Sequence, residues 1–411
     1  MPTNYSQKSW IYEYNLTSQD LTQFGLGAGI NGDIYFFLSL SRSHTADFLI
    51  CLTPNGIVRW KVYLEPVPDM FPVGVSNIVS DLQGVLFYTV SWTGDEYYTA
   101  KICRITEAQT PHPIQECTEN YQLYNDIITP LSLNEKYDLL VTAVTDDEFE
   151  SVPAVLNKKT LAVQWINRHF FGAGMSRHYR CDINTGDILW IGGDRNLLKF
   201  KYDGQNLINN YTQPNDDGID FVLDKQKQII IRPWQNMTDL PWKYVVSSYD
   251  VSTREIKLRW NWHPPSLIVA NDDMTTPTID DNGIVYMSSM PLVFAIDNLG
   301  KTLWTSELAT PSEMKTFQLI SFCIAMNLKR RTLYIVSGSP IYQKSKFLYF
   351  ITAVNMDTGK VIKRIDVNVG SKKYITPQCP ILIGDEMFYF AWLTGQYPES
   401  VPFKITGMKQ V

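Results

Sequence analysis

Residues Thr276–Leu308 read TPTIDDNGIVYMSSMPLVFAIDNLGKTLWTSEL, and the pattern of this stretch decides the fold. Asn282-Gly283 and Asn298-Leu299-Gly300 are tight-turn signals, because Asn and Gly accept the positive φ angles that such turns need. Met290-Pro291 turns the chain between them. The segments between the turns are short, and Ile284–Ser288 is rich in β-formers and alternates. The stretch therefore predicts four successive antiparallel strands: Thr276–Ile279, Ile284–Ser288, Leu292–Ile296 and Thr302–Glu307.

A turn that ends in Gly and leads into a strand carrying Trp recurs along the chain. It is seen in Asn55–Trp60 and, more loosely, in Ser252–Trp260 and in the Gly-ending turn before Val361–Val367. A related turn, Asp182–Gly186, precedes Trp190. A single four-stranded unit cannot bury both of its faces, so we expect copies of it to stack side by side.

This recurring pattern resembles the PQQ-like repeat of quinoprotein-type β-propellers, in which a DxxTGxxxW segment lets a Trp dock between neighbouring blades. The resemblance implies an all-β propeller. Seven complete repeats, three C-terminal strands and one N-terminal strand predict a single domain over residues 1–411 with eight blades, and seven blades are the alternative. Residues 9–16 are expected to complete the last blade and close the ring, since closure removes exposed sheet edges.

The composition excludes several classes of protein. The net charge is −6, and no basic run is longer than Lys329-Arg330-Arg331, so a nucleic-acid-binding surface is not expected. The hydrophobic runs have the length of strands, and no membrane span is expected. The first ten residues have neither a basic start nor an apolar core. We therefore expect a cytoplasmic protein, with a secreted mature form as the alternative.

The six cysteines fall into two groups. Cys103 and Cys117 flank a predicted hairpin that sets them nearly opposite each other on adjacent strands. A disulfide between them would form in an oxidising compartment, so the bonded and free states both stay open. The remaining cysteines lie in apolar strand patterns and are expected in the core: Cys51, Cys181, Cys323 and Cys379.

The candidate site lies on the face where loops surround the central channel of a propeller. The densest polar cluster flanks Gly172–Gly174. Its predicted catalytic residues are Arg177, His178, His169 and Tyr179, because His exchanges protons near neutral pH and Arg holds anions. The predicted ligand-binding residues are Arg168, Phe71, Tyr97, Asp146, Asp194, Arg195, Trp234, Asp273 and Tyr374. The alternative is that these residues make structural hydrogen bonds and surface ion pairs.

No cofactor is expected. The acidic pairs Asp146-Asp147, Asp216-Asp217 and Asp272-Asp273 would suit Ca²⁺, but solvated turn residues are the simpler interpretation. Quinoprotein dehydrogenases that resemble this repeat carry a disulfide between adjacent cysteines. This chain has no such pair, and PQQ is therefore not expected.

Three functions follow, in order of preference. The first is a protein that binds a small organic ligand in the central funnel and acts as a non-redox lyase, transferase or cyclase. Its chemistry would be acid–base catalysis, cyclisation, elimination or alkyl transfer. The alternative is a non-catalytic protein-interaction scaffold with a partner on the loop face. The second alternative is a PQQ-dependent dehydrogenase.

Overall fold

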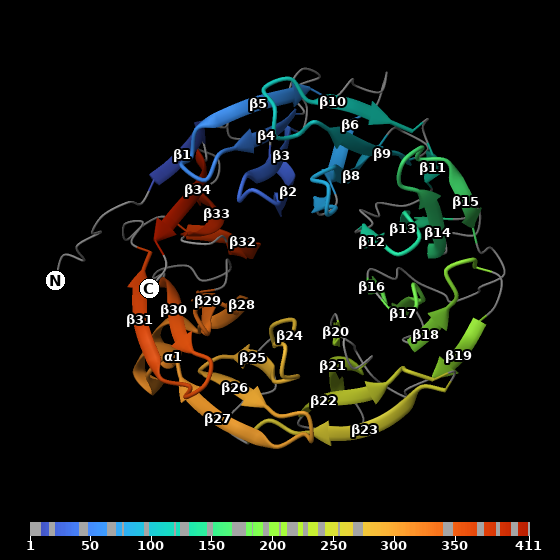
Figure 1. Ribbon diagram of the computed structural model, residues 1–411. Helices are drawn as coiled ribbons and strands as arrows, with labels where there is room; N and C mark the ends of the chain where they lie inside the picture. The colour runs from blue at the N-terminus through green and yellow to red at the C-terminus, as the bar shows by residue number, and fades with distance from the viewer. Residues whose placement is uncertain are drawn as a thin grey trace. The chain divides into compact units, whose positions relative to one another are not determined.

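In a computed structural model of the chain, the structure is described for a set of ranges with gaps between them. They are residues 10–15, 21–40, 48–63, 71–75, 78–93, 98–118, 121–123, 131–145, 151–166, 178–182, 184–191, 197–204, 207–211, 221–224, 229–236, 243–253, 255–265, 274–339, 348–367, 374–383, 387–395 and 402–409. The chain forms two compact units, one of Ser18–Gln213 and one of Met1–Thr17 with Pro214–Val411. Each unit is described below by itself (Figure 1).

The unit Ser18–Gln213 contains four antiparallel sheets. They are β2 (Leu21–Ala28), β3 (Ile34–Leu40), β4 (Phe48–Leu52) and β5 (Val58–Tyr63); β6 (Phe71–Val75), β7 (Val79–Ser80), β8 (Leu86–Thr93), β9 (Tyr98–Thr106), β10 (Ile114–Cys117) and β11 (Tyr121–Leu123); β12 (Ser132–Asn134), β13 (Leu139–Thr145), β14 (Ser151–Asn157) and β15 (Val163–Ile166); and β16 (His178–Cys181), β17 (Ile188–Ile191), β18 (Leu197–Phe200) and β19 (Leu207–Tyr211).

The other unit also contains four antiparallel sheets. They are β20 (Val222–Asp224), β21 (Ile229–Asn236), β22 (Lys243–Asp250) and β23 (Lys257–Trp262); β24 (Thr278–Ile279), β25 (Val285–Ser289), β26 (Leu292–Ile296) and β27 (Thr302–Glu307); β28 (Ile320–Asn327), β29 (Thr332–Gly338), β30 (Tyr349–Asn355) and β31 (Val361–Asp366); and β32 (Tyr374–Ile383), β33 (Met387–Gly395) and β34 (Pro402–Lys409) with β1 (Trp10–Asn15).

The stretch Thr276–Leu308 forms the sheet β24–β27. All four predicted strands are confirmed, and the first begins two residues later than predicted. The turn before β25 has Gly283 at φ +78°, and the Gly283 amide donates to the Asp280 carbonyl over 2.9 Å. Local turn chemistry therefore sets the order of these strands, as the sequence predicted.

The predicted blade count is wrong. Among the described strands, six sheets are blades of four consecutive strands, and two sheets depart from that pattern. In the sheet β6–β11, both edge strands are split, because β6 and β7 pair with β8 while β10 and β11 pair with β9. The last sheet has three consecutive strands, and β1 pairs along β34 from Trp10↔Gly407 to Asn15↔Pro402. Six regular blades thus replace the predicted eight and the alternative of seven. The extent of a single closed domain over residues 1–411 stays a prediction.

The core lies between neighbouring sheets of each unit. Successive side chains along a strand point to opposite faces of its sheet. The second strand of a blade therefore contacts the sheet on either side of it. In β25, Tyr286 packs towards the sheet β28–β31 with Leu333 and Ile335, and Val285 packs towards the sheet β20–β23 with Val246. All five residues are at most 2% exposed. This two-sided burial explains why every residue of β25 and β26 is buried and why β26 is apolar along its whole length.

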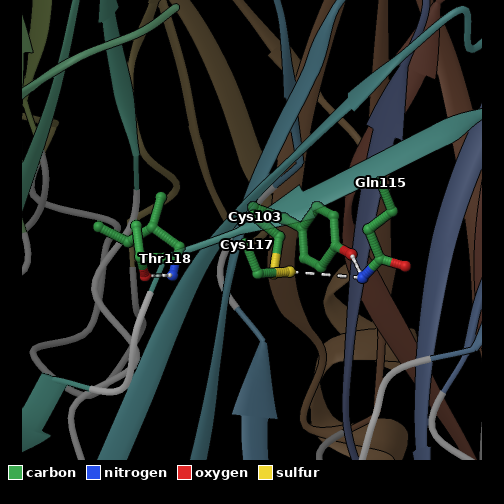
Figure 2. The surroundings of a disulfide bond; sticks show 6 residues. Cys103, Gln115, Cys117 and Thr118 are labelled. Carbon is green, nitrogen blue, oxygen red and sulfur yellow. Dashed lines mark hydrogen bonds between the residues drawn. A yellow bond between two sulfur atoms is a disulfide. The ribbon is translucent and has the colours of Figure 1, made fainter. Parts of the chain in front are cut away.

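A disulfide joins Cys103 to Cys117 (Figure 2), which answers the question that the sequence left open. Of the four predicted core cysteines, Cys51 and Cys181 are buried, as predicted. Cys323 is half-buried, and the side chain of Cys379 lies outside the described residues.

The one helix in the described residues, α1 (Pro311–Phe317), begins with a capping box. The Thr310 hydroxyl accepts from the Glu313 amide, and the Glu313 carboxylate accepts from the Thr310 amide over 2.9 Å. The other Glu313 oxygen lies 2.9 Å from a guanidinium nitrogen of Arg364 in β31. The helix is thus tied to its own blade. No helix among the described residues has the length and apolar character to cross a membrane.

Glu313→Gln is expected to remove a contribution to the free energy of unfolding that depends on pH. Burial by itself raises the pKa of Glu313, but the Thr310 amide and Arg364 outweigh it and hold the pKa below its ordinary value. Such a carboxylate stabilises the fold above its unfolded pKa of about 4.3, and this contribution disappears as the pH falls through the folded pKa. Urea midpoints measured on acidification should therefore fall more steeply for the wild type than for the variant. Exposed Glu307→Gln is the control, and parallel profiles for wild type and Glu313→Gln would contradict the prediction.

Candidate functional site

Most of the predicted site residues lie outside the described part of the chain. These residues are Arg177, His169, Arg168, Tyr97, Asp146, Asp194, Arg195 and Asp273. The acidic pairs proposed for Ca²⁺ also lie outside it. For a further group the structure places only the backbone: Phe71 in β6, His178 in β16, Trp234 in β21 and Tyr374 in β32. The site formed by these residues stays a prediction.

Tyr179 is the one predicted catalytic residue whose side chain is described. It pairs with Trp190 across β16 and β17, and the two rings stack with their centroids 5.1 Å apart and their planes 9° from parallel. Both side chains are 1% exposed and pack in one core cluster with Cys181 and Leu198. Tyr179 thus stabilises its blade, and its catalytic role stays a prediction.

Within the described ranges, four outer-strand tryptophans dock on the neighbouring blade of the same unit. The acceptor is in each case a backbone carbonyl in the turn between the third and fourth strands of the next sheet. The indole Nε1–H groups donate from Trp60 to Ala108 (2.7 Å), from Trp165 to Tyr202 (2.9 Å), from Trp260 to Asn298 (3.0 Å) and from Trp304 to Met356 (2.9 Å). We call this arrangement the tryptophan dock. The sequence pointed to Trp60, Trp260 and Trp304, but it missed Trp165, because no Gly-ending turn signal precedes that residue.

Three of the docks place a glycine under the indole ring. A Cβ atom would lie 2.3 Å from Trp165 if built on Gly204, 2.9 Å from Trp260 if built on Gly300 and 2.6 Å from Trp304 if built on Gly359. The three glycines have φ values of +72°, +81° and +72°. These turns therefore need glycine both for the backbone conformation and for the close approach of the ring.

The dock of Trp165 differs from the other three because its acceptor residue is aromatic, whereas the others are Ala108, Asn298 and Met356. The rings of Tyr137 and Tyr202 stack with centroids 3.8 Å apart, and Tyr202 is the residue whose carbonyl accepts from Trp165. Tyr202 is 36% exposed, whereas Tyr137 and Trp165 are half-buried. We call Tyr137, Trp165 and Tyr202 the aromatic patch. Tyr and Trp side chains that reach the surface are enriched where proteins bind other proteins.

A lysine lies beside the aromatic patch. The Lys136 ammonium is 5.4 Å from the centroid of the Tyr137 ring, and it donates to the Asn184 carbonyl. Neither of these two partners carries a negative charge. The patch therefore combines apolar rings with a positive charge that these contacts do not neutralise.

Three carboxylates surround the buried ammonium of Lys158. Its Nζ is 3.2 Å from Asp81, 2.6 Å from Glu135 and 3.5 Å from Asp138. Burial by itself lowers the pKa of Lys158, but Glu135 and Asp81 outweigh it and raise the pKa above its ordinary value. Asp81 belongs to the sheet β6–β11, and the other residues belong to the sheet β12–β15. The cluster is thus an ionic link between two blades, because the ammonium of Lys158 in one blade lies near Asp81 in the other. Each charge in it has a partner of opposite sign.

A second charged link joins the sheets β24–β27 and β28–β31. Asp280 Oδ2 accepts from Arg331 Nη1 over 2.9 Å and from the Tyr286 hydroxyl over 3.1 Å. Arg331 also donates to Asp357 over 2.7 Å, and hydrogen bonds to Asp357 and Asp280 raise the pKa of Arg331. Burial raises the pKa of Tyr286, so its hydroxyl is a neutral donor. These groups are fully engaged in holding two blades together.

Among the described residues, no group of three or more His, Cys, Asp or Glu side chains is arranged to hold a metal ion. The expectation that the protein uses no cofactor stays a prediction, because the acidic pairs of the loops lie outside those residues.

No protein-family model matches the chain, and no curated protein matches it in sequence. Solved structures do match it. One is the C-terminal WD40 domain of Sif2, with a TM-score of 0.60 and 7% identity, in an alignment that covers 96% of this chain and 97% of that one. Another is Saccharomyces cerevisiae Sqt1, with a TM-score of 0.57 and 8% identity, covering 97% of this chain and 98% of that one.

Identities this low establish the fold alone. The structural neighbour whose description names a repeat is a WD40 domain, and the resemblance to PQQ-like repeats stays a prediction. The predicted fold class is corrected accordingly, from a propeller of eight or seven blades to one with six regular blades and WD40 neighbours. The chain has a β-propeller fold, all-β apart from one short helix in its described residues.

Proposed function

We propose that the chain is a protein-interaction scaffold that binds a partner protein at the aromatic patch. Of the predicted functions, this was the alternative to a ligand-binding enzyme. The likeness to a WD40 propeller supports it at the level of the fold. The main support for the proposal is the aromatic patch, because it offers a surface that a partner protein can bind.

The chemistry of the patch defines the kind of partner. Tyr202 offers an exposed ring with few rotatable bonds, and the half-buried rings of Tyr137 and Trp165 support it, so that little entropy is lost when it is immobilised. Lys136 adds a positive charge next to these rings. The fitting partner is a protein segment that presents an apolar side chain next to a carboxylate.

Two roles of Trp165 have to be separated. Its indole N–H donates to the Tyr202 carbonyl, and the same kind of bond is made in three other docks. This contact is therefore part of the fold. The stacked pair of Tyr137 and Tyr202 is present at this dock, and the acceptor residues of the other docks are Ala108, Asn298 and Met356. The Tyr202 side chain is therefore the position at which binding can be tested without removing a dock.

The test begins with a photo-reactive aromatic amino acid at position 202, the exposed ring of the patch, which cross-links a protein that contacts the patch. The partner identified in this way is then purified, and its affinity is measured by calorimetry. Tyr202→Ala is expected to weaken binding about ten- to thirty-fold, the effect of losing an interface aromatic. Lys136→Gln should reduce the dependence of affinity on salt concentration.

The control is Leu299→Ala, because Leu299 is 64% exposed in the equivalent turn below Trp260. It should leave the affinity for the purified partner within about two-fold of the wild type. Equal affinities for the wild type and Tyr202→Ala would contradict the proposal. So would turnover of a small substrate that is lost in His178→Ala without a change in melting temperature.

A further inference from the structure

The hairpin onto which Trp60 docks differs from the hairpins of the other docks. It spans residues 107–113, between β9 and β10, and contains Pro111 and Pro113. The acceptor residue Ala108 is fully buried, and Trp60 is 5% exposed. The hairpin 107–113 contains no glycine, whereas Gly204, Gly300 and Gly359 lie under the indole rings of the other three docks. This hairpin is therefore held in place by something other than a tight glycine turn.

A covalent bond closes the base of this hairpin. Cys103 in β9 and Cys117 in β10 lie directly opposite each other in the strand register, and their sulfur atoms are bonded (Figure 2). The strand β10 is only four residues long. Gln115 Nε2 donates to the Tyr88 hydroxyl over 3.0 Å, and the Thr118 amide donates to the Ile102 carbonyl over 3.0 Å. The disulfide is the one covalent link among these contacts.

The two sulfur atoms are in different environments. Cys103 is fully buried in the same core cluster as Trp60, Tyr88 and Ala108. Cys117 is exposed on the outer strand. The Cys117 sulfur, which accepts from Gln115 Nε2 over 3.5 Å, is therefore the end of the bond that a thiolate from solution would attack.

We propose that the Cys103–Cys117 disulfide is a redox-controlled clasp, whose reduction by a dithiol releases the hairpin 107–113 and loosens the docking of Trp60. The thiolate of the dithiol attacks the Cys117 sulfur, and Cys103 leaves as a thiolate that takes up a proton. The second thiol of the dithiol then displaces Cys117 as a thiol. The dithiol is oxidised to a disulfide, and the protein disulfide is reduced to two thiols. The state of the clasp thus follows the redox poise of the compartment.

Hydrogen exchange with and without dithiothreitol tests the clasp in the full-length chain. After native-state reduction, mass spectrometry should find Cys103 and Cys117 as free thiols. Amides of peptides covering 104–118 should then exchange at least about ten-fold faster, because the closed loop no longer restricts the hairpin. Peptides covering 57–63, which contain Trp60, should exchange faster as well. Peptides across the hairpin below Trp260, at 296–302, should exchange at an unchanged rate.

Two variants complete the experiment. Cys103→Ala/Cys117→Ala should exchange as fast as the reduced wild type, with or without dithiothreitol. Cys181→Ala, which removes a buried thiol of the same unit that is outside the disulfide, should keep the full response. A disulfide that resists dithiothreitol until the protein is denatured would overturn the proposal. Complete reduction with no change in exchange at 104–118 would overturn it too. Both results come from the wild-type protein, so a variant that fails to fold does not decide the question.

Discussion

Asp280→Ala is expected to lower the free energy of unfolding of the unit that contains it by about 3–5 kcal/mol, because it removes a buried carboxylate that accepts four hydrogen bonds. The Asp280 side chain is fully buried. One oxygen accepts from Arg331 and Tyr286, and the other accepts from the amides of Asn282 (3.0 Å) and Ile284 (2.9 Å). The substitution leaves a buried hydroxyl and two turn amides without this acceptor, and each unsatisfied group costs about 1–3 kcal/mol.

The matched control is Asp357→Asn. Asp357 bonds to the same Arg331, but its side chain is 55% exposed. An exposed ion pair contributes about 0–1 kcal/mol, so this variant should lose little stability. Urea unfolding followed by circular dichroism measures both variants. Equal losses for the two aspartates would show that the buried acceptor is not what links the sheets β24–β27 and β28–β31.

Gly359→Ala is expected to cost about 3 kcal/mol, because it combines backbone strain with a steric clash. Gly359 has φ +72°, a conformation that costs an L-residue about 1–2 kcal/mol. The new Cβ would lie 2.6 Å from the Trp304 ring and 2.8 Å from the Ser306 hydroxyl. The indole would have to move, and its bond to the Met356 carbonyl would be lost.

Gly32→Ala separates these two contributions. Gly32 has a similar φ of +76°, but the nearest atom to its new Cβ would be Pro54 Cγ at 3.4 Å, an ordinary contact. This variant should therefore lose about 1–2 kcal/mol, the backbone strain alone. Denaturant titration of both variants gives the difference. If Gly359→Ala loses no more free energy of unfolding than Gly32→Ala, the predicted steric clash with Trp304 is wrong.

Features set by neighbouring residues in the chain could be predicted from the sequence. The turn at Asn282-Gly283 and the alternation predicted for Ile284–Ser288 are local, and the sheet β24–β27 forms where they indicated. The blade count could not be obtained in this way. The split of one outer strand into β10 and β11 depends on which residues pair with β9, and no local pattern at Cys117 or Tyr121 records that choice.

For the candidate site, too, the sequence could not predict which residues meet in space. The predicted catalytic residues were chosen because loops of a propeller converge, and Tyr179 proved to be a stacked core residue in the described structure. The aromatic patch was missed, because Tyr137, Trp165 and Tyr202 come from three different turns and strands. Only the packing of the sheet β12–β15 against β16–β19 brings these rings together.

The sequence by itself determined that this chain folds into short antiparallel strands in repeated four-stranded sheets. Turn residues and alternating polarity act over a few positions, so this information is complete within each repeat. Only the tertiary structure decided which tryptophans dock, that Cys103 and Cys117 are bonded, and where aromatic rings gather on the surface. The physical reason is distance along the chain, since the donors and acceptors of the docks are 37 to 52 residues apart and meet only when neighbouring sheets pack.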